Sequence, residues 1–193
     1  RYDTRNSSYN PTGGNVSRFE QKLPVLSSEN EIENTFVFST YKALNSEENM
    51  VGKFSFFFKS VNSLDGSDVR ISKRSTIPYS RLRGFEKGKV GPKDGEEFIG
   101  GNYAAAVNLS SNLPGILSTV ESLDFSYFID LGNVWGIDYD STIDDSNELR
   151  SSTGIAMDYL SPIGPLNFSW TLPITKKSSD KTEIFRFNLG TTF

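Results

Sequence analysis

The sequence predicts an all-β fold, an antiparallel transmembrane β-barrel in which residues 1–193 form a single domain. Three observations predict it. Most segments alternate large apolar with polar or small side chains, which is the period of a strand with one face in lipid and one in water. Aromatic residues make up 13% of the chain, with 15 Phe and 8 Tyr, as suits strands and membrane interfaces. Short and long connections also alternate along the chain, as they do between the two ends of such a barrel.

About eight segments are predicted strands, each near the length that a tilted strand needs to cross a bilayer. Their ranges are 16–25, 34–44, 50–61, 101–113, 122–135, 150–160, 166–173 and 184–193. Segment 34–44 is assigned by its content of Phe, Val, Thr and Tyr. The other seven segments are assigned as strands by their two-residue period. The expected lipid-facing rows are Phe19, Leu23 and Val25; Phe54, Phe56 and Phe58; Tyr103, Ala105, Val107 and Leu109; Leu123, Phe125, Tyr127, Ile129 and Leu131; Ile155, Met157 and Tyr159; and Leu166, Phe168, Trp170 and Leu172.

The opposite rows are polar or small, as the inside of a barrel requires. Segment 50–61 places Lys53 and Lys59 on that side, and segment 122–135 places Asp124 and Asp130 there. Two carboxylates on one face of a strand point towards water or a cation. No stretch approaches the roughly 20 apolar residues of a transmembrane helix, so only tilted strands could cross a bilayer.

The last segment is the most informative one. Its apolar row contains Phe185, Phe187, Leu189 and Phe193, whereas Arg186, Asn188, Gly190 and Thr192 share the other face. An amphipathic terminal strand that ends on an aromatic residue suits the closing strand of a bacterial outer-membrane barrel. A strand of a soluble sandwich would show the same period.

The connections favour the barrel over the sandwich. Residues 45–49 and 161–165 are tight turns, whereas residues 62–100 and 136–149 are long and polar. If the carboxyl terminus lies in the periplasm, counting strands backwards places both tight turns on that side and both long loops outside. A soluble sandwich gives no reason for this segregation.

Composition excludes several classes of function. The chain has no cysteine and no histidine, which removes thiol nucleophiles, disulfides, histidine triads and most zinc and haem sites. This composition does not exclude catalysis, but the commonest catalytic groups are missing, and we find no Ser-His or paired-carboxylate arrangement for an outer-membrane lipase or protease. We expect neither a metal nor a cofactor. The net charge of -4 argues against nucleic acid as a partner. Because the chain starts at Arg1 without a signal peptide, we interpret it as a portion of a longer protein.

Several motifs, in order and spacing, resemble the barrel of the BamA family of outer-membrane protein assembly factors, which are POTRA-barrel insertases. They are Arg81-Leu-Arg-Gly-Phe85, Gly100-Gly-Asn102, Phe128-Ile-Asp-Leu-Gly-Asn-Val-Trp135, Gly154-Ile-Ala-Met-Asp158, Ser161-Pro-Ile-Gly-Pro-Leu166 and the final strand. The resemblance implies the carboxyl-terminal half of a barrel of sixteen strands. The POTRA domains and the first strands of the family are absent from this sequence. About eight strands could close a narrow barrel alone, or leave two edges that seek partners.

The resemblance also implies a function. The family inserts client outer-membrane proteins into the lipid of the bacterial outer membrane without nucleotide or metal, and its POTRA domains bind accessory lipoproteins. The last strand pairs weakly with the first, so that this lateral seam can open and template a client strand. Here the seam would comprise Phe185, Phe187, Leu189, Gly190 and Phe193, with Gly190 as a weak point. The alternative is a passive outer-membrane barrel, a pore or a scaffold built from the same half.

By resemblance, the long loop folds into the lumen and its arginine docks on the inner wall. The loop residues are Arg83, Gly84 and Phe85, and the wall residues are Phe128, Asp130 and Gly132, with Asp158 as a possible second carboxylate. The family's usual second acidic position aligns with Ser110 here. A guanidinium suits this role because it binds a carboxylate bidentately and stacks on a ring. The alternative is that Arg83 is an ordinary solvated loop arginine.

The acidic loop 138–145 has the spacing of a calcium loop, but Ile143 stands where an EF-hand needs glycine. A solvated loop without a metal is the better interpretation.

Overall fold

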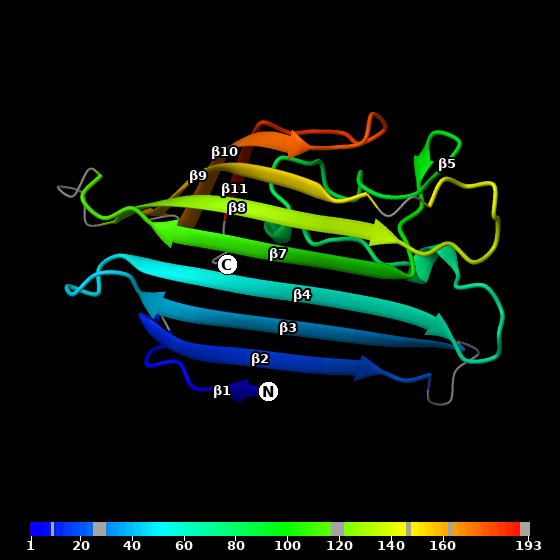
Figure 1. Ribbon diagram of the computed structural model, residues 1–193, viewed down its shortest axis with the longest axis horizontal. Coiled ribbons are helices and arrows are strands. Elements are labelled where there is room, and N and C mark those ends of the chain that lie inside the picture. The colour runs from blue at the N-terminus through cyan, green and yellow to red at the C-terminus, as the bar shows by residue number, and fades with distance from the viewer. Residues whose placement is uncertain (9, 25–29, 117–121, 146–147, 162–163, 190–193) are drawn as a thin grey trace.

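The computed structural model describes residues 1–8, 10–24, 30–116, 122–145, 148–161 and 164–189. Its main feature is a nine-stranded antiparallel sheet in the order β1-β2-β3-β4-β7-β8-β9-β10-β11 (Figure 1). The strands are β1 (Tyr2–Asp3), β2 (Gly13–Lys22), β3 (Glu31–Ala43), β4 (Val51–Ser63), β7 (Tyr103–Asn112), β8 (Leu123–Trp135), β9 (Arg150–Ser161), β10 (Gly164–Thr175) and β11 (Phe185–Leu189). All eight predicted strands are therefore confirmed, and the two-residue β1 is an addition.

The outward row of the sheet is apolar and exposed, as predicted. Phe187, Trp170 and Ile155 are 50%, 46% and 44% exposed on β11, β10 and β9. The outward rings also meet across strands, because Phe36 lies 6.2 Å from Phe56 and Phe168 lies 5.0 Å from Phe187 between ring centroids. A strand face that stays exposed and aromatic over successive strands is the surface that lipid covers.

The inner face packs against the long connection between β4 and β7. This connection, residues 64–102, contains two 3-10 turns, η1 (Ile71–Lys73) and η2 (Tyr79–Arg81), and a small hairpin of β5 (Lys93–Asp94) and β6 (Glu97–Phe98). In Figure 1 it leaves the end of β4 and runs back behind β8 and β9. Its apolar side chains and those of the wall form the buried core: Phe57, Ile77, Leu82, Phe85, Val90, Ala104, Ala106 and Val134.

The connections are segregated by length, as the sequence predicts. The β3–β4 turn is closed by a 2.7 Å hydrogen bond from the Leu44 N–H to the Met50 carbonyl, at the left end of Figure 1. The β4–β7 and β8–β9 connections lie at the opposite end. Which end faces the periplasm stays a prediction.

The sheet does not close within the described part of the chain. Its end strands are β1 and β11, and no described residue of one pairs with the other. The expectation that these strands could form a narrow closed barrel alone is therefore wrong. Pairing between copies stays untested. No helix in the described part of the chain is long and apolar enough to span a membrane.

Candidate functional site

The tip of the β4–β7 loop meets the inner face of β8 at Asp130. The Arg83 guanidinium donates from Nε to Asp130 Oδ2 at 2.7 Å and from Nη2 to Oδ1 at 2.8 Å. The backbone N–H of Arg83 also donates to Oδ2, at 3.1 Å. The contact is the bidentate geometry in which arginine recognises a carboxylate most strongly. Arg83 is thus bound to the wall rather than solvated.

The Asp130 side chain is fully buried, whereas that of Arg83 is 18% exposed. A fourth donor completes the environment of the carboxylate, because Asn108 Nδ2 donates to Oδ1 at 2.9 Å. The same amide donates to the Arg81 carbonyl at 2.7 Å, which ties the loop to β7 as well. A buried carboxylate with this many donors is compensated for its loss of water.

An aromatic wall lies beneath the guanidinium. The Arg83 Cζ is 3.4 Å from the centroid of the Phe128 ring, so the planar cation stacks on the ring face. Gly154 on β9 makes room for this ring, because a Cβ there would lie 2.8 Å from Phe128 Cζ. Packing against Phe128 therefore explains why the Gly154-Ile-Ala-Met-Asp158 motif begins with glycine.

Gly84 lets the loop turn against the wall. Its φ is +88°, and a Cβ would lie 2.6 Å from Thr171 Cγ2 and 3.2 Å from Ser152 Cβ. Only glycine adopts this conformation without strain in so little space. Next to it, Ser152 Oγ donates to the Arg83 carbonyl at 2.5 Å, which adds β9 to the strands that hold the tip.

Phe85 and Gly132 pack the loop onto the sheet. Phe85 is 1% exposed and belongs to the buried core. At Gly132, a Cβ would lie 2.8 Å from Ile77 Cδ1, so the missing side chain allows the loop to approach β8. Of the residues predicted for this site, Arg83, Gly84, Phe85, Phe128, Asp130 and Gly132 are brought together.

Asp158 is not part of this contact. It accepts a hydrogen bond from Asn167 Nδ2 at 2.7 Å, and no hydrogen bond or ion pair of the described residues joins it to Arg83. The expectation that Asp158 shares the arginine is not met by this geometry. Asn108 takes the second position instead. The period already places Asn108 on the inner face, but only the register, in which it lies opposite Asp130, shows that it reaches the carboxylate.

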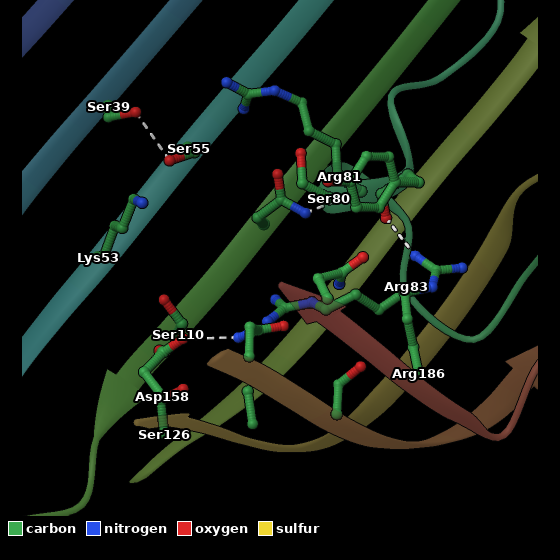
Figure 2. A pocket seen from close by; sticks show the side chains of 16 residues that line it. Ser39, Lys53, Ser55, Ser80, Arg81, Arg83, Ser110, Ser126, Asp158 and Arg186 are labelled. Carbon is green, nitrogen blue, oxygen red and sulfur yellow. Dashed lines mark hydrogen bonds between the residues drawn. The ribbon is translucent and has the colours of Figure 1, made fainter. Parts of the chain in front are cut away.

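A polar cavity of about 270 Å³ lies beside the clamp, on the inner side of the sheet (Figure 2). Figure 2 shows the side chains of Lys53, Arg81, Arg83 and Arg186 around it, and Asp158 and Ser110 line it as well. Arg81 lies with its Cζ 5.5 Å from the centroid of the Phe57 ring and forms no ion pair with another described residue. The two arginines of the motif therefore occupy different environments.

The last strand exposes its predicted apolar row. Phe185, Phe187 and Leu189 are 48%, 50% and 56% exposed, and β11 pairs with β10 from Leu166↔Leu189 to Trp170↔Phe185. Gly190 and Phe193 lie outside the described residues. Sequence reasoning missed Arg186, which points inward and is 9% exposed.

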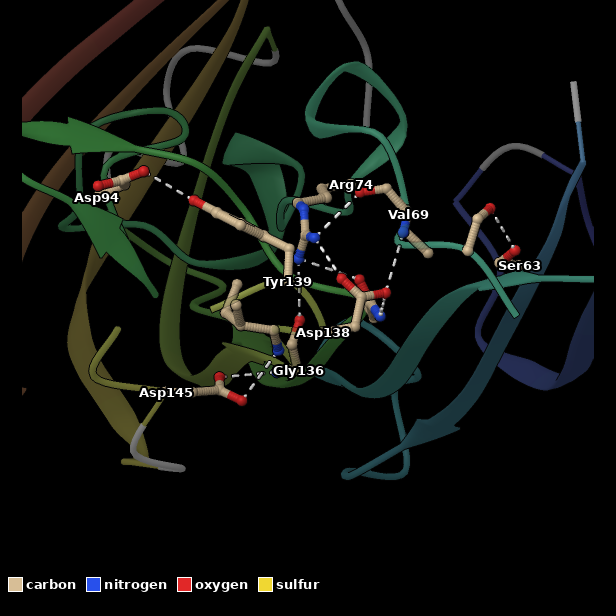
Figure 3. A network of polar contacts seen from close by, with 11 residues as sticks. Ser63, Val69, Arg74, Asp94, Gly136, Asp138, Tyr139 and Asp145 are labelled. Carbon is tan, nitrogen blue, oxygen red and sulfur yellow. Dashed lines mark hydrogen bonds and ion pairs between the residues drawn. The ribbon is translucent and has the colours of Figure 1, made fainter. Parts of the chain in front are cut away.

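The acidic loop after β8 is exposed at Asp140, Ser141, Thr142 and Asp144, whereas Asp138 and Asp145 are bound by neighbouring groups (Figure 3). Asp138 forms an ion pair with Arg74 and accepts from the Val69 N–H and the Asn102 side chain. Burial opposes its ionisation, but these three donors hold the pKa of Asp138 below its usual range. Asp145 accepts the backbone N–H groups of residues 136 and 137 at 2.8 and 3.0 Å. No group of three acidic side chains converges on one point among the described residues.

The chain is similar in sequence and structure to known proteins. The family model of the Omp85 superfamily domain matches residues 1–193. The outer membrane protein assembly factor BamA of Neisseria meningitidis serogroup B is 36% identical over an alignment of 140 residues, and the match covers 58% of this chain and 17% of that protein. A SAM50-like protein of Schizosaccharomyces pombe is 27% identical over 146 residues, 72% of this chain and 30% of that protein.

Among solved structures, the crystal structure of BamA from Haemophilus ducreyi lacking POTRA domains 1–3 is similar, with a TM-score of 0.84 and 31% identity. The match covers 96% of this chain and 40% of that chain. The chain thus spans less than a third of the length of the two curated relatives.

Proposed function

Because the chain belongs to the Omp85 superfamily and forms part of a BamA-type barrel of the bacterial outer membrane, we propose that it serves outer-membrane protein assembly. In this proposal the complete protein inserts and folds client β-barrel proteins without catalysing a chemical reaction. Client strands enter through a lateral seam at β11, and no nucleotide, metal or other cofactor takes part.

The observation that carries the proposal is the position of β11 at the edge of the sheet. One edge of this strand pairs with β10, and no described strand pairs with the other. An edge strand presents a row of backbone donors and acceptors, to which another strand can add. The exposed outward row of β11 would keep the incoming strand at the depth of the lipid.

The clamp has a separate role in the proposal. The loop fills the inner side of the sheet, and Arg83 and Asp130 fix its tip against β8. A loop held in this way keeps the wall in one shape while the edge at β11 exchanges partners. Outer-membrane lipid and client proteins are the direct partners. Accessory lipoproteins would be reached through POTRA domains elsewhere in the complete protein.

Site-specific photo-crosslinking in the complete protein tests the seam. A benzophenone side chain replaces Phe187 on β11, and in a matched variant it replaces Phe56, an equally outward residue of the central strand β4. We expect client proteins to crosslink during assembly at position 187 and not at position 56. A passive barrel would yield no client crosslink at either position, and that result would refute the proposed function.

A further inference from the structure

The side chain of Arg186 joins the last strand to the clamped loop. Its Nη2 donates to the Phe85 carbonyl at 2.6 Å, and its Nη1 donates to the Tyr79 carbonyl at 2.7 Å. The third nitrogen, Nε, donates to Glu183 Oε2 at 2.7 Å. Figure 2 shows Arg186 extending from β11 into the cavity beside the loop. A guanidinium is the one side chain whose fixed fork can serve three acceptors at once.

Backbone contacts place the loop beside the connection that leads into β11. Phe85 and Thr182 form an isolated antiparallel bridge. The Glu86 N–H donates to the Lys181 carbonyl at 3.0 Å, and the Glu183 N–H donates to the Gly84 carbonyl at 3.0 Å. The loop tip therefore acts as a short extra strand along the segment that enters β11.

Two loop residues, Arg83 and Phe85, are thus bound to different strands. Arg83 is held by Asp130 of β8 and by Ser152 of β9, whereas the carbonyl of Phe85 is held by Arg186 of β11. Only Gly84 separates the two attachments. A displacement of the Arg83 end of the tip moves the acceptor of Arg186, since the backbone between them is a single buried residue.

We propose that Arg186 is a positioning residue that couples the clamp at Asp130 to the last strand, so that loop release loosens β11. This deepens the proposed function, because β11 is its seam strand. The coupling acts in both directions, as linkage requires, so detachment of β11 from β10 also weakens the hold on the loop tip. The chemistry that controls the seam is thus a guanidinium on the strand and two backbone carbonyls on the loop.

Hydrogen exchange of the complete protein in detergent micelles tests the coupling. The variant Arg83→Ala changes a residue that makes no hydrogen bond or ion pair with the described residues of β11, and the amides of Phe185–Leu189 report the result. We expect these amides to exchange about tenfold faster than in the wild type. In an Arg186→Gln background, which already lacks the coupling, Arg83→Ala should add less than about twofold.

Asn188→Ala supplies the matched background. Asn188 is the next inward residue of β11 and makes no hydrogen bond to the loop among the described residues. In that background the tenfold response to Arg83→Ala should persist. The coupling is overturned if Arg83→Ala speeds exchange of the loop amides while the β11 amides keep their wild-type rates. It is equally overturned if the β11 response is unchanged by Arg186→Gln.

Client insertion is not measured in this experiment, so its outcome is independent of the crosslinking test at position 187. A β11 that responds to Arg83 but never contacts a client would leave the coupling intact and refute the seam. A client crosslink at position 187 together with a β11 that does not respond to Arg83→Ala would support the seam and refute the coupling.

Discussion

Substitution of Arg83 by alanine removes one partner of a shielded ion pair, and the cost follows from burial. The remaining Asp130 carboxylate is fully buried and keeps only the Asn108 amide as a side-chain donor. Breaking a buried pair from one side typically costs about 3–5 kcal/mol, whereas an exposed pair contributes about 0–1 kcal/mol. The stacking on Phe128 adds about 0.5–2 kcal/mol. We therefore expect Arg83→Ala to lower the unfolding temperature by on the order of 10 °C.

The assay is heat-dependent gel mobility of the complete protein, in which folded and unfolded barrels migrate differently. Arg81→Ala is the matched control, because Arg81 lies two residues away and has no carboxylate partner among the described residues. It should lower the transition by at most about a quarter as much. Equal behaviour of the two variants, or wild-type behaviour of Arg83→Ala, would refute the reasoning from burial.

A second substitution separates charge from packing. In the double variant Arg83→Ala/Asp130→Asn, the buried side chain is neutral and can still accept from Asn108. If the uncompensated charge carries most of the cost, the double variant should be more stable than Arg83→Ala alone by about 1–3 kcal/mol. If the lost packing of the Arg83 side chain accounts for most of the cost, the double variant should be no more stable than Arg83→Ala alone.

Two further predictions concern the loop and the acidic segment. Gly84→Ala should destabilise the barrel by about 1–3 kcal/mol, because its φ is +88° and its Cβ would touch Thr171. Gly88 also has a positive φ, +68°, but open space around it, so Gly88→Ala should cost only the conformational strain of about 1 kcal/mol. Thermal unfolding compares the two variants. The lowered pKa of Asp138 stabilises the fold above its ordinary value of 3.8, and this contribution disappears as the pH falls through the folded pKa. The difference in unfolding temperature between wild type and Asp138→Asn should therefore be largest near neutral pH and shrink below about pH 3.8; a difference independent of pH would contradict it.

The strands could be predicted from the sequence because their chemistry repeats every two residues. Phe54, Phe56 and Phe58 point one way on β4, and Ser55 and Phe57 point the other, as the period requires. The clamp could be predicted in part, since the period places Asp130 inward and the motif places Arg83 in the loop. Its third member could not. Asn108 contacts Asp130 through the pairing register of β7 with β8, and register is a property of two strands together.

The interior of the long loop was beyond sequence reasoning for a different reason. Its 3-10 turns and the β5–β6 hairpin are too short to show a period, so tertiary contacts decide where they form. The same holds for the acidic loop, whose spacing indicates solvent exposure although Arg74 binds Asp138 in the structure. Arg186 is the plainest case. Its place on the inner face follows from alternation, but its two acceptors on the loop lie 101 and 107 residues away in the chain.

The loop is held by two kinds of contact that contribute differently. Leu82, Phe85 and Val90 supply burial, which stabilises the loop against the sheet but permits small displacements along it. The pair of Arg83 and Asp130 contributes little net free energy once its desolvation is subtracted, yet a shift of either group by one ångström would leave a buried charge without its donors. The apolar cluster therefore determines that the loop stays inside, and the ion pair determines where its tip lies. Arg186 binds the Phe85 carbonyl at that tip, so a change in the tip's position changes a contact of the last strand. The position that the ion pair gives the tip therefore matters more for β11 than the free energy that the pair contributes.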